Sequence, residues 1–201
     1  MNTPVAPRNP ASLLQSERLQ LEASHPLLAP AICDFHQRNL AHLAPWEPPR
    51  SADFLEPVAT EARMNAEVSA FAHGQMWRYW LTRHGEPTEV IGQCQVSQVA
   101  RGVAQNAWLG YSLDAAQQGQ GYMQEALHCL LDELFSPRVW LHRIQVAVRP
   151  DNAPSLRVME RMGFREEGLC RDYLFIAGAW RDHKIFALTN PAWDRTEPPL
   201  I

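Results

Sequence analysis

The feature that most constrains the fold is the apolar pattern between residues 123 and 135. Apolar side chains recur there at the three- and four-residue spacing of one helix face, while charged and amide side chains occupy the other face. The apolar positions are Met123, Ala126, Leu127, Leu130, Leu131, Leu134 and Phe135. A helix of this kind must bury its stripe against another element, so a layered core is expected.

Strands are predicted on both sides of this helix. Short segments rich in Val, Ile, Trp and Tyr are separated by Gly, Pro and Asn turns, and those between 76 and 113 form a predicted antiparallel meander. We expect strands at 18–23, 76–83, 90–99, 107–113, 143–148, 164–175 and 180–188, and further helices at 25–39, 51–73 and 153–162. Strands and helices do not alternate strictly, which indicates an α+β domain.

The length and the prolines set the expected domain limits. A chain of 201 residues, at roughly 150 residues per domain, predicts one domain. Prolines concentrate at both ends, so we expect a flexible N-terminal arm at 1–15, the domain at 16–193 and a tail at 194–201. A third proline cluster at 45–49 predicts a rigid loop, because proline does not continue a helix.

Charge and cysteine usage exclude several classes of protein. The net charge of −4 provides no strong basic field for nucleic acid or anionic lipid. No apolar run approaches the ~20 residues of a membrane span, and the N-terminus lacks a secretory apolar segment. The four cysteines form no CxxC pair, and no Cys/His cluster has metal-ligand spacing. We therefore expect a cytoplasmic protein with reduced thiols, no metal and no membrane contact.

The segment Gln117-Gln118-Gly119-Gln120-Gly121-Tyr122-Met123 joins a strand to the striped helix. Two glycines one residue apart let successive N–H groups point into one concavity, to which the helix N-terminus adds its positive end. This predicts a cradle for a pyrophosphate; the alternative is a plain tight turn. It is neither a Walker loop nor a Rossmann fingerprint, because the required Lys and third Gly are missing.

A second segment gives this cradle a family context. The 143–148 strand leads into Asn152-Ala-Pro-Ser155, and the next helix ends at Gly163-Phe164. Both segments, in this order, resemble the GNAT superfamily of N-acetyltransferases. The resemblance implies a single mixed, mostly antiparallel, twisted sheet of about six or seven strands flanked by about four helices. It also implies acetyl-CoA as the acetyl donor.

Three further segments resemble one branch of that superfamily, the RimJ-type ribosomal-protein-alanine N-acetyltransferases. They are the loop Arg38–Arg50, the stretch Arg171–His183, and Ala187–Trp193. The likeness runs from about residue 16 to 193 and implies acetyl transfer to a protein N-terminal amine, in that branch on a small-subunit ribosomal protein. We expect a monomer or a homodimer.

The resemblance also implies which residues contact acetyl-CoA. They are Tyr111, Ser112, Leu113, Gln117, Gln118, Gly119, Gln120, Gly121, Tyr122, Met123, Asn152 and Ser155. In this family the pantetheine arm lies between two splayed strands, here 107–113 and 143–148. A backbone N–H of the first strand, from residues 111–113, then faces the thioester carbonyl.

The expected catalytic residues are Ser155, Asn152, Tyr173 and Asp172. Many relatives have an acidic tyrosine in the helix after Asn152, but Met159 stands there, which makes Ser155 the candidate donor to the leaving sulfur. The alternative for Ser155 is an ordinary first-turn helix residue.

The general base is less directly indicated. Two positions at which relatives carry glutamates are Ala147 and Leu174 here, so Asp172, Tyr173 and His183 are the candidates for the base. An α-amine with a pKa of ~7.7–8.0 needs only a weak base near pH 7, whereas a lysine at ~10.4 needs a stronger one.

Trp46, Glu47 and Tyr173 are the predicted acceptor-binding residues, and the loop 40–50 and the turn 176–181 are expected to form the acceptor groove. Two other functions stay open at this point. One is a small-molecule N-acetyltransferase acting on polyamines, amino acids or antibiotics. The other is a non-catalytic acetyl-CoA-binding ribosome-assembly factor.

Overall fold

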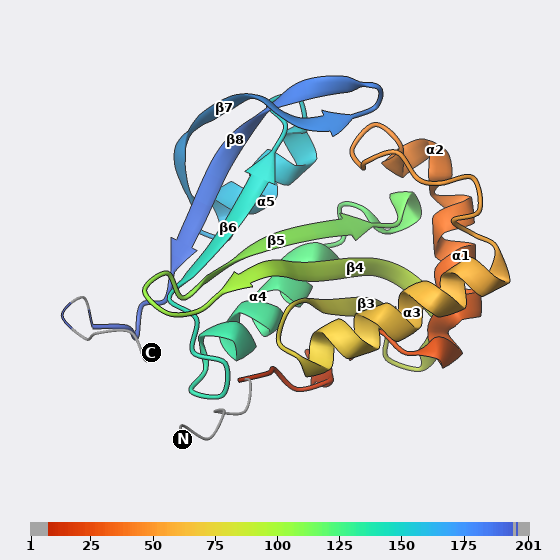
Figure 1. Cartoon of the computed structure of the whole chain (residues 1–201), viewed down its shortest axis with the longest axis horizontal. Coiled ribbons are helices and arrows are strands. Elements are labelled where there is room, and N and C mark those ends of the chain that lie inside the picture. The colour runs from red at the N-terminus through yellow and green to blue at the C-terminus, as the bar shows by residue number, and fades with distance from the viewer. Residues whose placement is uncertain (1–7, 195, 197–201) are drawn as a thin grey trace, which may run out of the picture.

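The computed structural model describes residues 8–194 and 196, and this part of the chain contains eight strands in one sheet (Figure 1). The strands are β1 (Leu13–Gln15), β2 (Leu19–Ala23), β3 (Trp77–Arg83), β4 (Glu86–Ala100), β5 (Asn106–Leu113), β6 (Arg143–Val148), β7 (Arg165–Ile176) and β8 (Ala179–Thr189). The helices are η1 (Pro26–Leu28), α1 (Ala29–Arg38), α2 (Leu40–Leu43), α3 (Pro57–Ala72), η2 (Ala115–Gln117), α4 (Tyr122–Phe135) and α5 (Ala153–Arg161).

The strand order is β1-β2-β3-β4-β5-β6-β8-β7, and only β5 and β6 run parallel among the described neighbours. The predicted α+β class with a mixed, mostly antiparallel sheet is confirmed. The described sheet has eight strands rather than six or seven. The additional strand is β1, which lies in the segment predicted to be a flexible arm.

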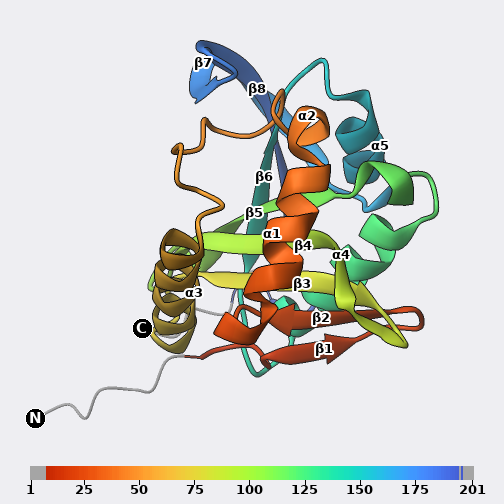
Figure 2. The same ribbon diagram turned by 90° about the vertical axis from the view of Figure 1, so that its right-hand side faces the viewer.

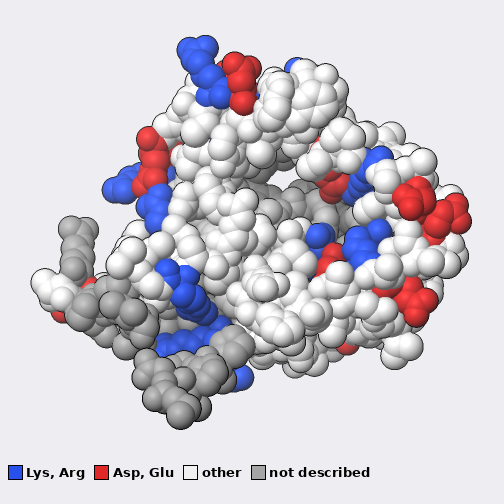
Figure 3. All heavy atoms as spheres, in the orientation of Figure 1, with Lys and Arg blue, Asp and Glu red and all other residues white. Residues whose placement is uncertain are grey.

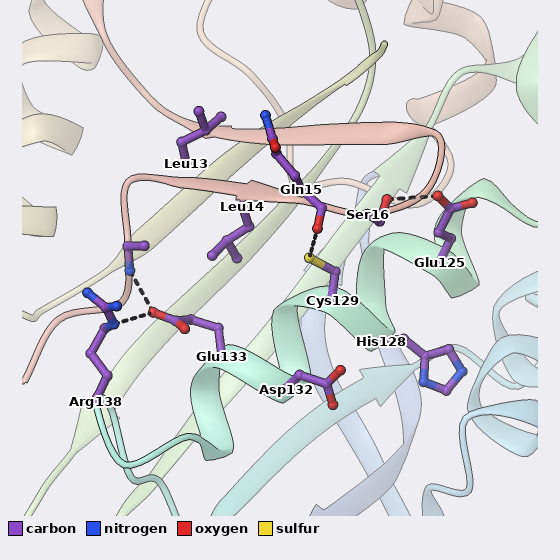
Figure 4. Close-up of a pocket in the computed structure, with 11 residues that line it drawn as sticks. Leu13, Leu14, Gln15, Ser16, Glu125, His128, Cys129, Asp132, Glu133 and Arg138 are labelled. Atoms are coloured by element: carbon purple, nitrogen blue, oxygen red, sulfur yellow. Dashed lines mark hydrogen bonds and ion pairs between the residues drawn. The ribbon is translucent and has the colours of Figure 1, made fainter.

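β1 belongs to the domain because two partners hold it. Leu14 is 9% exposed in the core, and β1 pairs with β2. The Glu133 carboxylate on α4 accepts the Ala11 N–H at 2.7 Å, across 122 positions of sequence (Figure 4). The expectation of an arm is therefore wrong for residues 13–15. Residues 1–7 and most of the predicted tail 194–201 lie outside the described residues.

The striped helix α4 packs on one face of the sheet. The predicted stripe residues Met123, Ala126, Leu127, Leu130, Leu131 and Leu134 are buried, and Phe135 is half-buried beside them. They pack against apolar residues of β2 to β6, which form the larger core. Burial of this apolar stripe is the main interaction that stabilises α4 as a helix in the folded protein.

α1 and α3 cover the other face near β3 and β4, and Figure 1 shows α3 in front of the sheet and α4 behind it. A second, smaller core lies between these helices and the sheet, and it contains Trp80 of β3 and Met64 of α3. The predicted helix at 51–73 begins only at Pro57, since proline fits the first turn of a helix but not its interior. The predicted helix at 25–39 divides into η1 and α1, with Pro30 in the first turn of α1.

β5 and β6 diverge after a short parallel contact. Their pairing stops at Trp108 opposite Gln145, while β5 continues to Leu113 and β6 to Val148. Figure 1 shows the two arrows pointing in different directions, and Figure 2 shows the same region from the side. The divergence leaves backbone groups of β5 without a strand neighbour on that side, where a ligand can replace the strand.

Candidate active site

The predicted anion cradle lies between η2 and α4. Gly119 and Gly121 have φ angles of 76° and 81°, in the left-handed region that favours glycine. Gly121 is the N-cap of α4 and no side chain caps this helix, so its first N–H groups are open to an anion. A Cβ at Gly119 would meet no atom within 4 Å, which leaves space beside this backbone for a phosphate.

The other predicted cradle residues divide into two groups. Gln118 and Gln120 are exposed, and Gln120 donates to the side chain of half-buried Gln117 at 3.2 Å. Tyr122 and Met123 are buried in the core below α4. Their side chains therefore anchor the helix, and only their backbone N–H groups can face a ligand.

Sequence reasoning missed Arg18, which lies beside the cradle. Its Nη1 donates to the Gln120 carbonyl at 3.1 Å, and its guanidinium lies 4.5 Å above the centre of the Tyr122 ring. Its Nε donates to Glu125 at 2.6 Å. Burial raises the pKa of Glu125, but hydrogen bonds from Arg18 and Ser16 lower it further, so the net pKa is below its usual range. Arg18 adds a fixed positive charge next to a proposed phosphate site.

A buried joint connects α1 to the residues before the cradle. Asn39 is 1% exposed and Asp114 is 5% exposed. The Asn39 amide donates to Asp114 at 3.0 Å and accepts the Ala115 N–H at 3.0 Å. Arg38 donates to the same Asp114 carboxylate at 2.6 Å. Burial raises the pKa of Asp114, but the hydrogen bonds from Asn39, Ala116 and Arg38 outweigh it and lower the pKa.

Three predicted site residues meet where β5 and β6 separate. The Asn152 side chain caps α5 by accepting the Ser155 N–H at 3.2 Å, as predicted. The Ser155 hydroxyl lies 2.6 Å from the phenol of Tyr111 on β5. Burial raises the pKa of Tyr111 more than its hydrogen bond with Ser155 lowers it, so this phenol stays protonated near neutral pH. The sequence indicated Tyr111 only as a cofactor contact.

The predicted oxyanion donor lies in β5, whose described pairing with β6 ends at Trp108. Ser112 and Leu113 pair with β4 on one side, and β6 has already diverged on the other. An N–H group that faces the gap can donate to a carbonyl oxygen placed there. The Ser112 hydroxyl accepts a hydrogen bond from Gln93 at 3.0 Å, which fixes this part of the strand.

The two predicted acceptor segments line one groove of about 510 Å³. Its walls come from α2 and the following loop on one side and from Ala177 and Gly178, the turn between β7 and β8, on the other. Glu47 and Arg50 line the groove and form an ion pair with each other. In Figure 3 a hollow opens in the molecule, with charged side chains on its right-hand rim.

The structure places Trp46 against Arg149. It is not among the described residues that line this groove; its ring instead lies 5.0 Å below the guanidinium of Arg149. Arg149 follows β6 and also donates to the Pro45 carbonyl at 2.7 Å. Trp46 and Arg149 together hold the loop after α2 against the end of β6, next to the divergence from β5.

Tyr173 and His183 lie together on β7 and β8, with ring centres 5.8 Å apart. Tyr173 also contacts Trp108 of β5, with ring centres 6.2 Å apart. His183 is 3% exposed, and its Nδ1 lies 2.9 Å from the Arg181 carbonyl. A carbonyl only accepts, so Nδ1 carries the proton and Nε2 carries the lone pair. Burial and the charge of Arg149 lower the pKa of His183.

Asp172 is the predicted catalytic residue with the least support from its surroundings. It is exposed, sits in an irregular part of β7 with a φ of 47°, and its N–H donates to Asp182 at 2.9 Å. No described hydrogen bond or ion pair connects its carboxylate to Ser155 or Asn152. Its positive φ shapes the bulge beside Tyr173.

The floor of the open sheet face near α3 is polar, which sequence reasoning also missed. Arg78 of β3 donates to Gln95 of β4 at 2.5 Å and pairs with buried Glu67 of α3 at 3.0 Å. Gln93 continues this row to Ser112. The signal was present as alternating polar residues in predicted strands, but their partners come from four separate elements.

No group of three or more His, Cys, Asp or Glu side chains in the described part of the chain could hold a metal ion. No described helix is long and apolar enough to cross a membrane.

Known proteins resemble the chain over most of its length. Residues 18–165 match the family described as the acetyltransferase (GNAT) domain. The chain is 34% identical to the ribosomal protein uS5-alanine N-acetyltransferase of Escherichia coli, over 92% of this chain and 94% of that protein.

Two solved structures share its fold. The ribosomal-protein-S5-alanine acetyltransferase from Vibrio fischeri superposes with a TM-score of 0.85 at 32% identity, covering 92% of this chain and all of that one (100%). RimJ of Mycobacterium smegmatis, in complex with CoA-disulfide, gives a TM-score of 0.84 at 30% identity, covering 96% of this chain and 93% of that one. The family that the cradle and the Asn152 segment predicted is confirmed: the chain belongs to the GNAT acetyltransferase family and is an N-acetyltransferase.

Proposed function

We propose that this enzyme transfers the acetyl group of acetyl-CoA to the α-amine at the N-terminus of a ribosomal protein, in a ternary complex. The observation that carries this proposal is the groove of about 510 Å³ between the α2 loop and the β7–β8 turn. Arg149 holds this loop at the end of β6, so the groove lies close to the opening between β5 and β6. An extended chain end can reach the opening from the groove.

The donor side of the proposal rests on the cradle and on β5. The open N–H groups at Gly119 and Gly121, with the charge of Arg18 beside them, suit the pyrophosphate of CoA. The Mycobacterium smegmatis relative was solved with a CoA disulfide, which supports CoA as the carrier. The β5 backbone between residues 111 and 113 is the proposed donor to the thioester oxygen.

The charges near the groove favour a peptide over a polyamine. Of the described residues that line it, Glu47 is the acidic one, and Arg50 already neutralises it. On the sheet floor, Glu67 is paired with Arg78. A polycationic acceptor would need several unpaired carboxylates, whereas a peptide end carries one positive charge and many neutral amide groups. The names of the relatives supply the ribosomal part of the proposal.

The proposed reaction needs only a weak general base to deprotonate the acceptor amine. Deprotonating an α-amine near pH 7 costs roughly 1 kcal/mol, against about 4.6 kcal/mol for a lysine side chain. His183 is the base we propose, with the Nε2 lone pair free of the Arg181 contact. As the new N–C bond forms, the C–S bond breaks and its electron pair leaves with sulfur. Ser155 donates to that sulfur, and the proton lost by the amine balances the one gained by the thiol.

The test compares two peptides of one sequence. One has a free N-terminus and no lysine, and the other has a blocked N-terminus and one lysine. Free spermidine is the third acceptor, and acetylation is followed by mass spectrometry with acetyl-CoA in excess.

We expect the free-terminus peptide to react fastest, by up to ~10²–10³ over the lysine peptide if deprotonation alone decides. Faster acetylation of the lysine peptide or of spermidine would overturn the N-terminal assignment. Acetyl-CoA binding without acetylation of any of the three, or of intact ribosomal proteins, would favour a non-catalytic role.

A further inference from the structure

A pair of hydroxyl groups bridges the opening between β5 and β6. Tyr111 comes from β5 and Ser155 from the first turn of α5, and their oxygens are 2.6 Å apart. The Tyr111 hydroxyl has a second, longer contact of 3.4 Å to the Ser155 carbonyl. Among the described residues, its hydrogen bonds go only to these two oxygens of Ser155. In the proposed acetyl transfer Ser155 donates to the sulfur, and the Tyr111 hydroxyl has no part so far.

The direction of this hydrogen bond follows from the two groups. The half-buried phenol keeps its proton near neutral pH, so it always has a hydrogen to donate. The shorter distance makes the Ser155 hydroxyl the better acceptor. A serine hydroxyl that accepts from Tyr111 still has its own hydrogen, and that hydrogen must point away from the phenol.

The surroundings of Ser155 leave the gap as the place for that hydrogen. Its backbone N–H is already bonded to Asn152, which fixes the first turn of α5. The residue is half-buried, with the opening between the diverging strands beside it. The positive end of α5 also favours negative charge at this point.

We propose that Tyr111 is a positioning residue for acetyl transfer, which accepts no proton itself but fixes the Ser155 hydroxyl so that it donates to the leaving thiolate. This proposal rests on the proposed function, because it assigns the sulfur to the gap between β5 and β6. The balance of the step is unchanged: the C–S bond breaks, sulfur takes the electron pair, and Ser155 supplies a hydrogen bond. By donating to the Ser155 oxygen, Tyr111 also makes the serine O–H a stronger donor.

The decisive variant is Tyr111→Phe, which keeps the ring and removes only the hydroxyl. We expect kcat to fall about tenfold, the worth of one oriented hydrogen bond, with the KM for acetyl-CoA within about twofold of wild type. Tyr79→Phe is the matched control. It removes the hydroxyl of a buried tyrosine two strands away from Tyr111, which donates to the Ala11 carbonyl at 2.5 Å, and kcat should not change.

A double-mutant cycle separates positioning from packing. In a Ser155→Ala background, Tyr111→Phe should change kcat less than about twofold, because nothing is left to orient. The full tenfold loss in that background would overturn the proposal. So would a wild-type kcat in the single variant, or a large rise in KM at constant kcat.

The slow hydrolysis of acetyl-CoA without an acceptor is the second readout. It expels the same thiolate, so Tyr111→Phe should slow it by a similar factor, and an unchanged hydrolysis rate would contradict the proposal. This readout does not depend on the acceptor. A failure of the N-terminal assignment would leave the hydrolysis result standing and is thereby distinguished from a failure of the Tyr111 assignment.

Discussion

The buried joint between Asn39 and Asp114 offers a sharp test of how α1 is attached to the cradle. The change is Asn39→Asp, which keeps the size of the side chain and replaces an amide donor by a second carboxylate. In the wild type, the Asn39 amide donates to Asp114 at 3.0 Å, and both residues are at most 5% exposed. The variant therefore places two carboxylates in contact in the core.

Two estimates bound the loss of folding stability in the Asn39→Asp variant. Two unit charges about 3 Å apart at an effective dielectric constant of about 20 repel by roughly 5 kcal/mol. Keeping one carboxylate protonated at pH 7, against an unfolded pKa of about 3.9, costs roughly 4 kcal/mol. Protonation costs less than the repulsion, so one of the two carboxylates is protonated in the folded variant. Arg38, at 2.6 Å from Asp114, attracts both carboxylates and lowers the figure somewhat.

The sign of the pH dependence follows from that proton. One carboxylate of the pair has a folded-state pKa above its unfolded value, so stability is lost as pH rises from about 4 to 7. Urea unfolding should show a deficit of about 4 kcal/mol at pH 7, which shrinks by about 1.4 kcal/mol for each unit of lower pH.

Two variants complete this experiment. Adding Asp114→Asn leaves a single carboxylate in the joint and should recover most of the lost stability. Asn65→Asp makes the same chemical change at an exposed position of α3 and should stay within about 0.5 kcal/mol of wild type. A deficit in Asn39→Asp that does not change with pH would refute the reasoning, because it would mean that packing and not charge causes the loss.

Two further predictions concern acid stability and acetyl-CoA binding. Burial, followed by the charges of Arg50, Arg63 and Arg78, lowers the pKa of His36 to about 3, so stability should fall as pH drops below the unfolded value of 6.5. At pH 4.5 this contributes about 2.7 kcal/mol, so His36→Phe should lose that much less between pH 7 and 4.5, and parallel urea-unfolding curves would contradict it. Gly119→Asp should weaken acetyl-CoA binding at least about tenfold in calorimetry, since its carboxylate would enter the anion cradle. Gly102→Asp, at a φ of 66° with open space around it, carries the same strain as a control, and equal affinities in the two variants would exclude the cradle.

Gly119 and Gly121 differ in their three-dimensional surroundings, which the sequence pattern does not show. The pattern treats Gly119 and Gly121 alike. In the structure, a Cβ at Gly121 would lie 3.5 Å from the Arg18 guanidinium, which would neutralise part of an introduced charge. Gly119 has no such neighbour, so it is the cleaner position. Arg18 is about 100 positions earlier in the chain, and its contact with Gln120 spans 102 residues.

Features that depend on neighbours along the chain could be predicted from the amino-acid sequence. The α4 stripe, the glycine cradle at its N-terminus and the Asn152 cap of α5 each depend on residues within a few positions of one another, where backbone preferences and helical period act directly. These local features were enough to predict the α+β class and the family, while the residues that contact the cofactor stay a prediction.

Contacts between side chains that are distant in the sequence became visible in the folded chain alone. β1 forms a strand because it pairs with β2, and the residue Ala11 just before it bonds to α4. Tyr111 contacts Ser155 across 44 positions of sequence, and Asn39 contacts Asp114 across 75. Trp46 contacts Arg149, which is about 100 positions later in the chain. Such contacts depend on how the strands diverge and how the helices pack. This packing is determined by the burial of apolar surface in the whole core, and no local sequence pattern contains that information.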